Sequence, residues 1–148
     1  MLKNIKNDLL YLLGILNSIS KIKKYSSEYT SADSFYNVND QLNFNACLNL
    51  LINIGENANK LSEELKNKYP KIEWIKIIAY RNRVVHDYKN IDIFVTHKII
   101  KEKLPELEST IYNIVESRLR VEDFDKEEYF IAKQSDFYRL IDFTKIQF

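Results

Sequence analysis

Apolar residues recur every three or four positions along most of the chain, which is the spacing of amphipathic α-helices. The first stripe predicts a helix from about residue 2 to residue 25, and its members are Ile5, Leu9, Leu12, Leu16 and Ile19. The polar stretch 26–39 is rich in Ser, Asn and Asp and predicts a loop. The chain therefore begins with a long helix followed by a polar connection.

A second helix is predicted over residues 40–68. Its apolar face carries the small residues Gly55 and Ala58, which would let another helix approach closely. Tyr69-Pro70 ends it, because the residue before a proline is disfavoured in the α region. A third helix should span 72–86 with four residues turned inward, namely Ile75, Ile78, Ala79 and Val85. We expect Trp74 and Cys47 to be core residues.

A fourth helical stretch is predicted over residues 93–120, where Pro105 introduces a kink or opens a second helix. Residues 121–148 have a weaker apolar period, and we expect Phe130, Phe137 and Leu140 to be buried. This tail could be an additional helix on the bundle, a partner-binding segment or an acidic cover; we favour the first. The expected fold is an all-α antiparallel bundle of four to five helices over residues 1–120, with a C-terminal extension over 121–148.

Composition narrows the function classes. The 148 residues include two Gly, two His and one Cys, which excludes a Gly-rich phosphate loop, an internal disulfide framework and a Cys-rich zinc site. No stretch approaches the roughly 18 apolar residues that span a bilayer. Lys3 and Lys6 before Leu9–Leu16 imitate a secretory signal only loosely, since the apolar run is short. We expect a cytoplasmic protein.

Charge is unevenly distributed although the formal net charge is +1. Residues 60–103 contain eleven basic and six acidic side chains, whereas residues 121–148 contain four basic and seven acidic ones. The basic segment is either a solvated surface or a footprint for phosphate groups.

The third predicted helix ends in the string Ala79-Tyr80-Arg81-Asn82-Arg83-Val84-Val85-His86-Asp87-Tyr88. Arginine forks bind phosphate oxygens, histidine carries protons near neutral pH, and Asn82 could orient a hydroxyl. Asn82 and His86 share a helix face, but Arg81 lies about 140° away. Either the helix ends near His86, or the site forms between two protomers. The count of only two histidines in the chain favours the second. The alternative for Arg81 and His86 alone is a surface arginine and a helix-terminal histidine.

Several ordered blocks resemble a known family. Residues 54–62 (IGENANKLS), 69–74 (YPKIEW), 81–88 (RNRVVHDY), 90–92 (NID) and 104–107 (LPEL) are similar to successive motifs of the HepT-like family of HEPN-domain toxins. Asn90 replaces the glycine of the family's "GID" block. The resemblance covers about Leu48 to Ile111 closely.

The resemblance implies a HEPN bundle that dimerises and acts as a metal-independent endoribonuclease toxin, paired with a nucleotidyltransferase antitoxin in a toxin–antitoxin system of type II or VII kind. The family's catalytic residues fall on Arg81, Asn82 and His86. Its modified tyrosine falls on Tyr88, to which the MntA-like partner would transfer AMP. No cofactor or metal is implied.

On this basis we expect Arg81 to bind the scissile phosphate, Asn82 to orient the 2′-OH, and His86 of each protomer to act as base or acid. Arg83, Lys76 and Lys89 would bind the RNA backbone. His97 is expected to be structural. The alternative function is a non-catalytic HEPN subunit that presents substrate to, or scaffolds, a nucleotidyltransferase; a generic dimerisation domain would leave the Arg–His–Tyr cluster unexplained.

Overall fold

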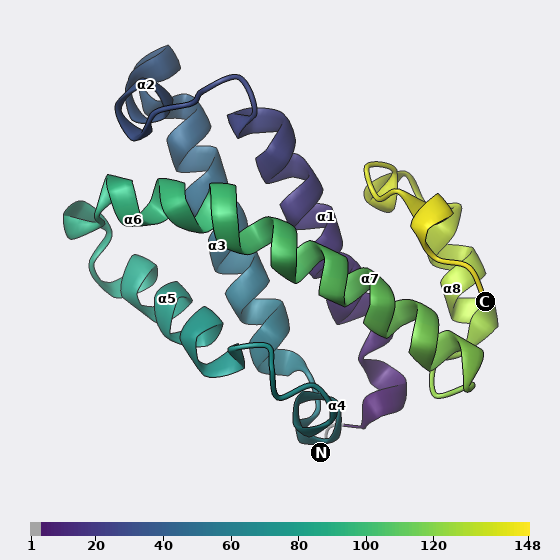
Figure 1. Ribbon diagram of the computed structural model, residues 1–148. Helices are drawn as coiled ribbons and strands as arrows, with labels where there is room; N and C mark the ends of the chain where they lie inside the picture. Colours follow the sequence, from purple (N-terminus) through teal and green to yellow (C-terminus); the bar gives the residue numbers. More distant parts are fainter. Residues whose placement is uncertain (1–3) are drawn as a thin grey trace.

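The computed structural model describes residues 4–148, and the secondary structure in that range is entirely helical. The bundle is built from α1 (Leu9–Ser26), α3 (Leu42–Lys60), α5 (Trp74–His86), α6 (Ile93–Lys98) and α7 (Leu104–Arg120), the last two forming one long rod (Figure 1). Shorter helices are α2 (Ala32–Asn37), α4 (Glu63–Lys68) and α8 (Lys126–Lys133). The short turns are η1 (Ile5–Asn7), η2 (Val38–Gln41), η3 (Tyr88–Asn90), η4 (Ile99–Lys103), η5 (Asp136–Tyr138) and η6 (Phe143–Lys145). The predicted all-α bundle is confirmed.

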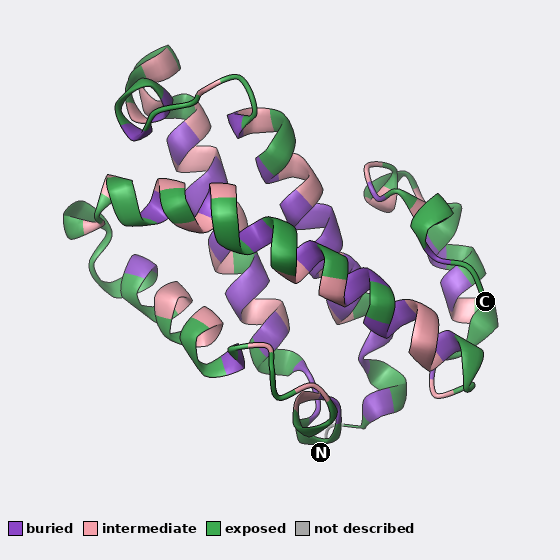
Figure 2. Ribbon diagram, in the orientation of Figure 1, coloured by how far each residue is buried: buried purple, intermediate pink, exposed green. Residues whose placement is uncertain are grey.

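The core lies where α1, α3 and α7 face one another, and Figure 2 shows buried positions concentrated there. α1 packs against both α3 and α7, while α5 packs against α3 from the other side. Cys47 and Trp74 are buried as predicted, and the Trp74 indole donates to the Tyr69 carbonyl at 3.2 Å. No helix within residues 4–148 is long and apolar enough to cross a lipid bilayer.

The first helix starts later than predicted. Residues 1–3, where we expected it to begin, lie outside the described range; η1 precedes α1, and Asp8 separates them. The buried Asp8 carboxylate accepts hydrogen bonds from the Ser62 amide at 2.9 Å and the Ser62 hydroxyl at 2.5 Å. This contact with a residue 54 positions away holds the start of α1 against the α3–α4 junction.

The predicted loop over 26–39 and the single helix over 40–68 are both wrong in part. Residues 32–37 form α2, because Ser31 caps its first turn by accepting from the Ser34 amide at 3.1 Å. α3 begins at Leu42, since residues 39–41 have positive φ angles. It ends at Lys60, because Ser62 adopts an extended conformation and caps α4 instead.

The inward face predicted for the third helix is also wrong. Trp74 and Val84 are the buried residues of α5, while Ile75 is 84% exposed and Ala79 and Val85 also face solvent. Ile78 is half-buried. The 3–4 spacing identified the helix correctly, but several apolar residues lie on a side that no other part of the described chain covers.

The predicted break near Pro105 is a π-helical turn. η4, a π-helical turn, continues α6 into α7, and it lies immediately before Pro105, the second residue of α7, which has no N–H to donate to the preceding turn. The buried aliphatic residues of this stretch are Ile100, Leu104, Ile111, Ile114, Val115 and Leu119.

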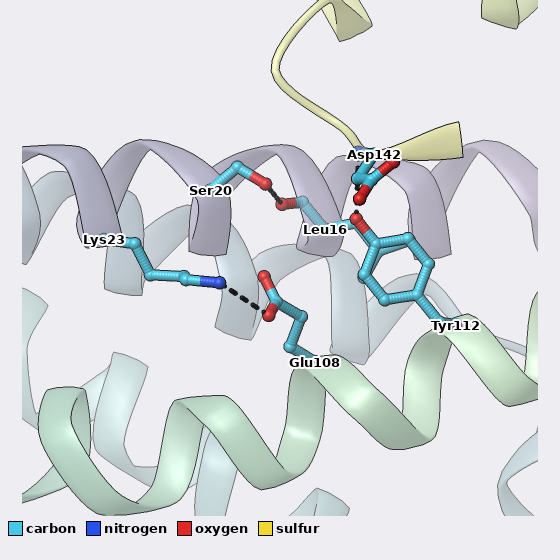
Figure 3. Close-up of polar contacts among 6 residues, drawn as sticks. All are labelled: Leu16, Ser20, Lys23, Glu108, Tyr112 and Asp142. Atoms are coloured by element: carbon cyan, nitrogen blue, oxygen red, sulfur yellow. Dashed lines mark hydrogen bonds and ion pairs between the residues drawn. The ribbon is translucent and has the colours of Figure 1, made fainter. Parts of the chain in front are cut away.

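The C-terminal extension is anchored on the bundle through α7 (Figure 3). The Asp142 amide donates to the Tyr112 hydroxyl at 3.1 Å, close to the ion pair between Lys23 of α1 and Glu108 of α7 at 2.9 Å. Phe130 and Phe137, predicted to be buried, are 50% and 62% exposed. The buried apolar side chains of the extension are instead Phe124, Tyr129, Ala132, Ile141 and Ile146. The pattern differs from the prediction because the chain after α8 turns back in short 3₁₀ segments rather than continuing as a helix.

Candidate functional site

Arg81 lies where α5 passes close to α3 at Gly55. A Cβ added at Gly55 would stand 2.2 Å from Arg81 Cβ and 2.7 Å from its Cγ. The absence of a side chain at Gly55 therefore seats the stem of Arg81 directly on α3, which confirms that this small residue permits a close helix approach. Arg81 is thereby fixed near its root rather than extended into solvent.

Two side chains orient the Arg81 guanidinium. Its Nη2 pairs with Glu56 Oε1 of α3 at 3.2 Å, and its Nη1 donates to Asn82 Oδ1 at 2.9 Å. Its Nε is buried without a partner. The Arg81 side chain is about 30% exposed, which leaves room for an incoming anion to contact it.

His86 is the last residue of α5 and is exposed. The Asp87 amide donates to the Arg83 carbonyl at 2.8 Å and closes the helix there. The sequence left two ways for Arg81 and His86 to form one site although they lie about 140° apart on a helix. Within one chain the structure shows the first, because α5 ends at His86. Asn82 is also exposed, four positions before His86 on the same side of α5.

Tyr88 follows in η3, half exposed, with its hydroxyl bonded to Asn45 Oδ1 of α3. Sequence reasoning missed Asn45, which lies outside the resembling blocks. A signal did exist: Asn45 and Glu56 are eleven positions apart, or three helical turns, so they share the side of α3 that faces α5. One stripe of α3 thus holds both Arg81 and Tyr88.

The three predicted RNA-backbone residues are spread over two surfaces. Arg83 and Lys89 are exposed near the end of α5. Lys76 lies on the first turns of α5 and pairs with Glu73, and that hydrogen bond lowers the pKa of Glu73. Lys76 also lines a cavity toward α7, on the side of α5 away from Arg81. The structure therefore does not bring Lys76 together with Arg81 in one chain.

Residues around the site have structural partners. Tyr80 and Thr96 share a hydrogen bond of 2.6 Å that ties α5 to α6, and burial raises the pKa of the Tyr80 phenol. His97 of α6 packs against Phe35 and stays half-buried, consistent with the structural role expected for it. Burial raises the pKa of Cys47 to about 12, which keeps it a thiol. No group of three His, Cys, Asp or Glu residues within 4–148 is arranged to hold a metal ion.

Comparison with known proteins identifies a family for this chain. The family described as "Ribonuclease HepT-like" matches residues 15–114, from α1 into α7. This range contains Gly55, Glu56 and the whole of α5. No solved structure shows a significant match to the chain.

Curated relatives carry related names. The chain is 30% identical over 116 residues to "Gamma-glutamylcyclotransferase and putative RNase MJ0434" of Methanocaldococcus jannaschii, covering 78% of this chain and half of that protein's length. It is 26% identical over 103 residues to "Putative RNase MJ1380" of the same organism, covering 68% of this chain and 90% of the relative. It is 28% identical over 97 residues to "Probable ribonuclease HepT" of Thermococcus cleftensis, covering 66% and 86%. With two thirds of its length matched by the family and the Arg81–His86 helix inside the match, the chain belongs to the HepT-like ribonuclease family.

Proposed function

We propose that this protein is an endoribonuclease whose catalytic residues are Arg81, Asn82 and His86. The observation that carries the proposal is the guanidinium of Arg81, seated on Gly55 and oriented by Glu56 and Asn82, on the helix that ends in the exposed His86. A preorganised cation beside an accessible imidazole suits a reaction in which a phosphodiester gains charge and protons move. The family membership and the ribonuclease names of the relatives support the same activity.

The proposed reaction needs no metal ion. One imidazole removes the proton of the 2′-OH, the 2′-oxygen bonds to phosphorus, and the bond from phosphorus to the 5′-oxygen breaks. A second imidazole, protonated, supplies the proton to that leaving oxygen. Arg81 would stabilise the phosphoryl oxygens as charge accumulates, exchanging part of its contact with Glu56 for the substrate. Asn82 would hold the 2′-OH.

The need for two imidazoles points to a homodimer. His86 is the single histidine of the motif, and His97 is engaged with Phe35. The outward side of α5 and the start of α6 expose large apolar residues, namely Ile75, Val85, Tyr88, Phe94 and Val95. Such exposure around the predicted active residues favours contact with a second copy, which would bring two His86 side chains together. The exposed Arg83 and Lys89 would contact RNA phosphates beside that interface, and Lys76 would bind RNA farther along α5.

We further propose that the protein is the toxin of a toxin–antitoxin pair, silenced by a nucleotidyltransferase that modifies Tyr88. The Tyr88 oxygen would attack the α-phosphorus of ATP held by the partner, pyrophosphate would leave, and the phenolic proton would pass to solvent. Tyr88 is half exposed, and its hydroxyl would be within reach of such a partner after giving up its bond to Asn45. The added phosphate would lie near the arginines of α5 and hinder RNA entry.

Cleavage of a defined RNA by the purified protein in the presence of EDTA tests the catalytic proposal. We expect His86→Ala to reduce the rate by about 10²- to 10⁴-fold, the usual contribution of general acid–base catalysis. His97→Asn is the matched control, because it changes the other histidine, which lies on a different helix, and should retain activity.

An unchanged rate for His86→Ala would contradict the assignment, and no cleavage by the unmodified wild-type protein would favour the non-catalytic scaffold instead.

Sedimentation of Ile75→Glu tests the dimer: we expect a monomer with little activity. Intact-mass measurement after co-expression with a nucleotidyltransferase tests the modification: a gain in AMP units should appear in wild type and be absent in Tyr88→Phe.

A further inference from the structure

The side of α3 that points away from the core carries a row of amide side chains. α3 lies between α1 and α5, and its buried apolar residues face the bundle (Figure 1). On its other side, Asn45, Asn49 and Asn53 follow one another at intervals of four residues and so form one ridge, here called the amide strip. Asn49 and Asn53 are exposed. The amide strip therefore presents uncharged polar groups to solvent.

Asparagine is concentrated in α3 although it is a poor helix-forming residue. Six of the fifteen asparagines of the chain lie among the 19 residues of α3, whereas the 17 residues of α7 contain one. Asparagine forms helices less readily than lysine, glutamate or glutamine, because its side chain competes for backbone hydrogen bonds. Helix stability therefore does not explain the asparagines at the exposed positions of α3, and contact with a ligand does.

The side-chain amides of Asn49 and Asn53 are available to a ligand. Within residues 4–148 neither amide makes a hydrogen bond. Other asparagines of the helix are engaged: Asn43 donates to the Tyr25 carbonyl at 2.9 Å, and Asn57 donates to the Asn53 carbonyl at 3.0 Å. An amide offers one acceptor and two N–H donors, so the two exposed side chains can bind a ligand without breaking a contact of the fold.

The amide strip runs beside the proposed active site. At one end, Glu56 follows Asn53 by about 4.5 Å along α3 and pairs with Arg81 at 3.2 Å. At the other end, Asn45 accepts a hydrogen bond from the Tyr88 hydroxyl. An RNA strand whose phosphate is bound at Arg81 would therefore cross the exposed amides within one or two nucleotides.

The charge of α3 also suits contact with RNA. Its 19 residues include one acidic and one basic side chain, Glu56 and Lys60, and the acidic one is paired with Arg81. Exposed carboxylates would repel phosphate groups, whereas amides carry no charge. The amide strip thus contributes hydrogen bonds rather than attraction for the backbone, and hydrogen bonds to base edges are the contacts that distinguish sequences.

The spacing of the amides favours single-stranded RNA. Successive members of the strip are about 6 Å apart along α3, whereas stacked bases follow one another at about 3.4 Å. Two neighbouring amides therefore match bases that are unstacked from each other, as in the loops and ends of RNA molecules. An asparagine amide binds adenine with two hydrogen bonds, to N6 and N7, while the same edge of guanine offers acceptors alone.

We propose that Asn49 and Asn53 bind base edges of single-stranded RNA next to the phosphate held by Arg81, with a preference for adenine. Oδ1 of each amide would accept from the adenine N6 amino group, and Nδ2 would donate to N7. The identity of the strand rests on the proposed function, because the phosphate at Arg81 determines where the strand crosses α3.

Binding of uncleavable strands by the full chain tests this assignment. The probes are fluorescent single-stranded oligoadenylate and oligouridylate with 2′-O-methyl groups, which cannot be cut by 2′-OH attack. We expect wild type to bind the adenine strand more tightly, and Asn49→Ala and Asn53→Ala each to reduce that preference about tenfold, the scale of losing one bidentate base contact. The ratio of the two affinities is measured because a loss of folding would weaken binding of both strands.

Asn113→Ala is the matched control. Asn113 is likewise an exposed asparagine inside a long helix, but it belongs to α7. Alanine is the better helix former, so thermal unfolding of all three variants should show an equal or higher midpoint than wild type. A reduced adenine preference in a stable variant then reflects a lost contact with the base.

An adenine preference that stays the same in Asn49→Ala and Asn53→Ala would overturn the assignment. No binding of either strand, or an equal reduction in Asn113→Ala, would also overturn it. A preference that depends on Asn49 and Asn53 in a protein that cleaves no RNA would support the amide strip and contradict the proposed activity. RNA cleavage without such a preference would support the activity and contradict the role of the amide strip.

Discussion

The helices α1 and α5 look alike in sequence and behave differently in the fold. Both carry apolar residues at helical spacing, yet ten of the 18 residues of α1 are buried against two of the 13 in α5. α1 lies between α3 and α7, whereas α5 lies at the edge and touches α3 with one side (Figure 2). The buried helix holds the molecule together, and the edge helix presents the residues proposed to act on RNA.

The difference in burial between α1 and α5 gives a meaning to the apolar residues of α5 that no other part of the described chain covers. Ile75 and Val85 share the outward part of α5 with Asn82 and His86. Exposed large apolar side chains are unfavourable for a monomer when they gather on one surface. Their presence beside the candidate catalytic groups is explained if this surface meets a second molecule, while the same residue types in α1 stabilise the monomer.

The largest contrast is expected from truncating one apolar residue in each helix. Leu16→Ala in α1 should reduce the free energy of unfolding by about 2–5 kcal/mol, because Leu16 is fully buried and its loss leaves a cavity. Ile75→Ala in α5 should change the stability of the monomer by about 0.5 kcal/mol or less. Urea unfolding of both variants at low protein concentration measures this, and equal losses would invalidate the comparison.

The next largest effect should come from the two glycines, Gly14 at the contact of α1 with α3 and Gly55 at the contact of α3 with α5. Gly55→Ala places a methyl group 2.2 Å from Arg81 Cβ, so α5 must move; we expect a loss of about 1–3 kcal/mol and displacement of Arg81. In Gly14→Ala the nearest atom, at 2.8 Å, is Nδ2 of Asn57, the end of a side chain that can rotate away. Thermal unfolding should therefore show the smaller shift for Gly14→Ala, and RNA cleavage should fall more steeply for Gly55→Ala.

A smaller, pH-dependent effect is expected at the start of α1. Burial raises the pKa of Asp8 above its ordinary value of 3.8, against the opposing hydrogen bonds from Ser62. The folded state therefore binds this proton more tightly than the unfolded state, and the resulting stability is present below pH 3.8 and lost as pH rises through the raised pKa. Asp8→Asn should remove this dependence.

Urea unfolding of wild type and Asp8→Asn across pH 3–7 measures that effect. The stability of Asp8→Asn relative to wild type should increase as the pH rises. A relative stability that decreased over the same interval would show that the hydrogen bonds from Ser62 outweigh the cost of burying the charge.

The smallest effect is expected at the end of α5. Tyr88→Phe removes one hydrogen bond to Asn45 at a half-exposed position, so the free energy of unfolding should fall by about 0.5 kcal/mol or less. Differential scanning calorimetry should show nearly superimposable transitions. A loss of several kcal/mol would mean that the Tyr88–Asn45 contact anchors α5 and is not free to be exchanged for a modification.

Much of the site was predictable because its residues are close in sequence. Arg81, Asn82, His86 and Tyr88 lie within eight positions, and helical spacing alone indicated that Arg81 diverges from His86. Asn45 was not predictable as the partner of Tyr88. That contact depends on how α5 packs against α3, and apolar period gives no information about this packing.

The sequence by itself determined the helical class, the approximate position of the four long helical segments, and the concentration of arginine, asparagine and histidine side chains at the end of α5. These depend on local spacing and residue type. Tertiary structure alone decided that α5 lies at the edge, that Gly55 seats Arg81 beside Glu56, and that Asp8 and Ser62 join distant segments. Helical periodicity identifies which residues share a face, but which faces meet depends on the packing of the whole chain.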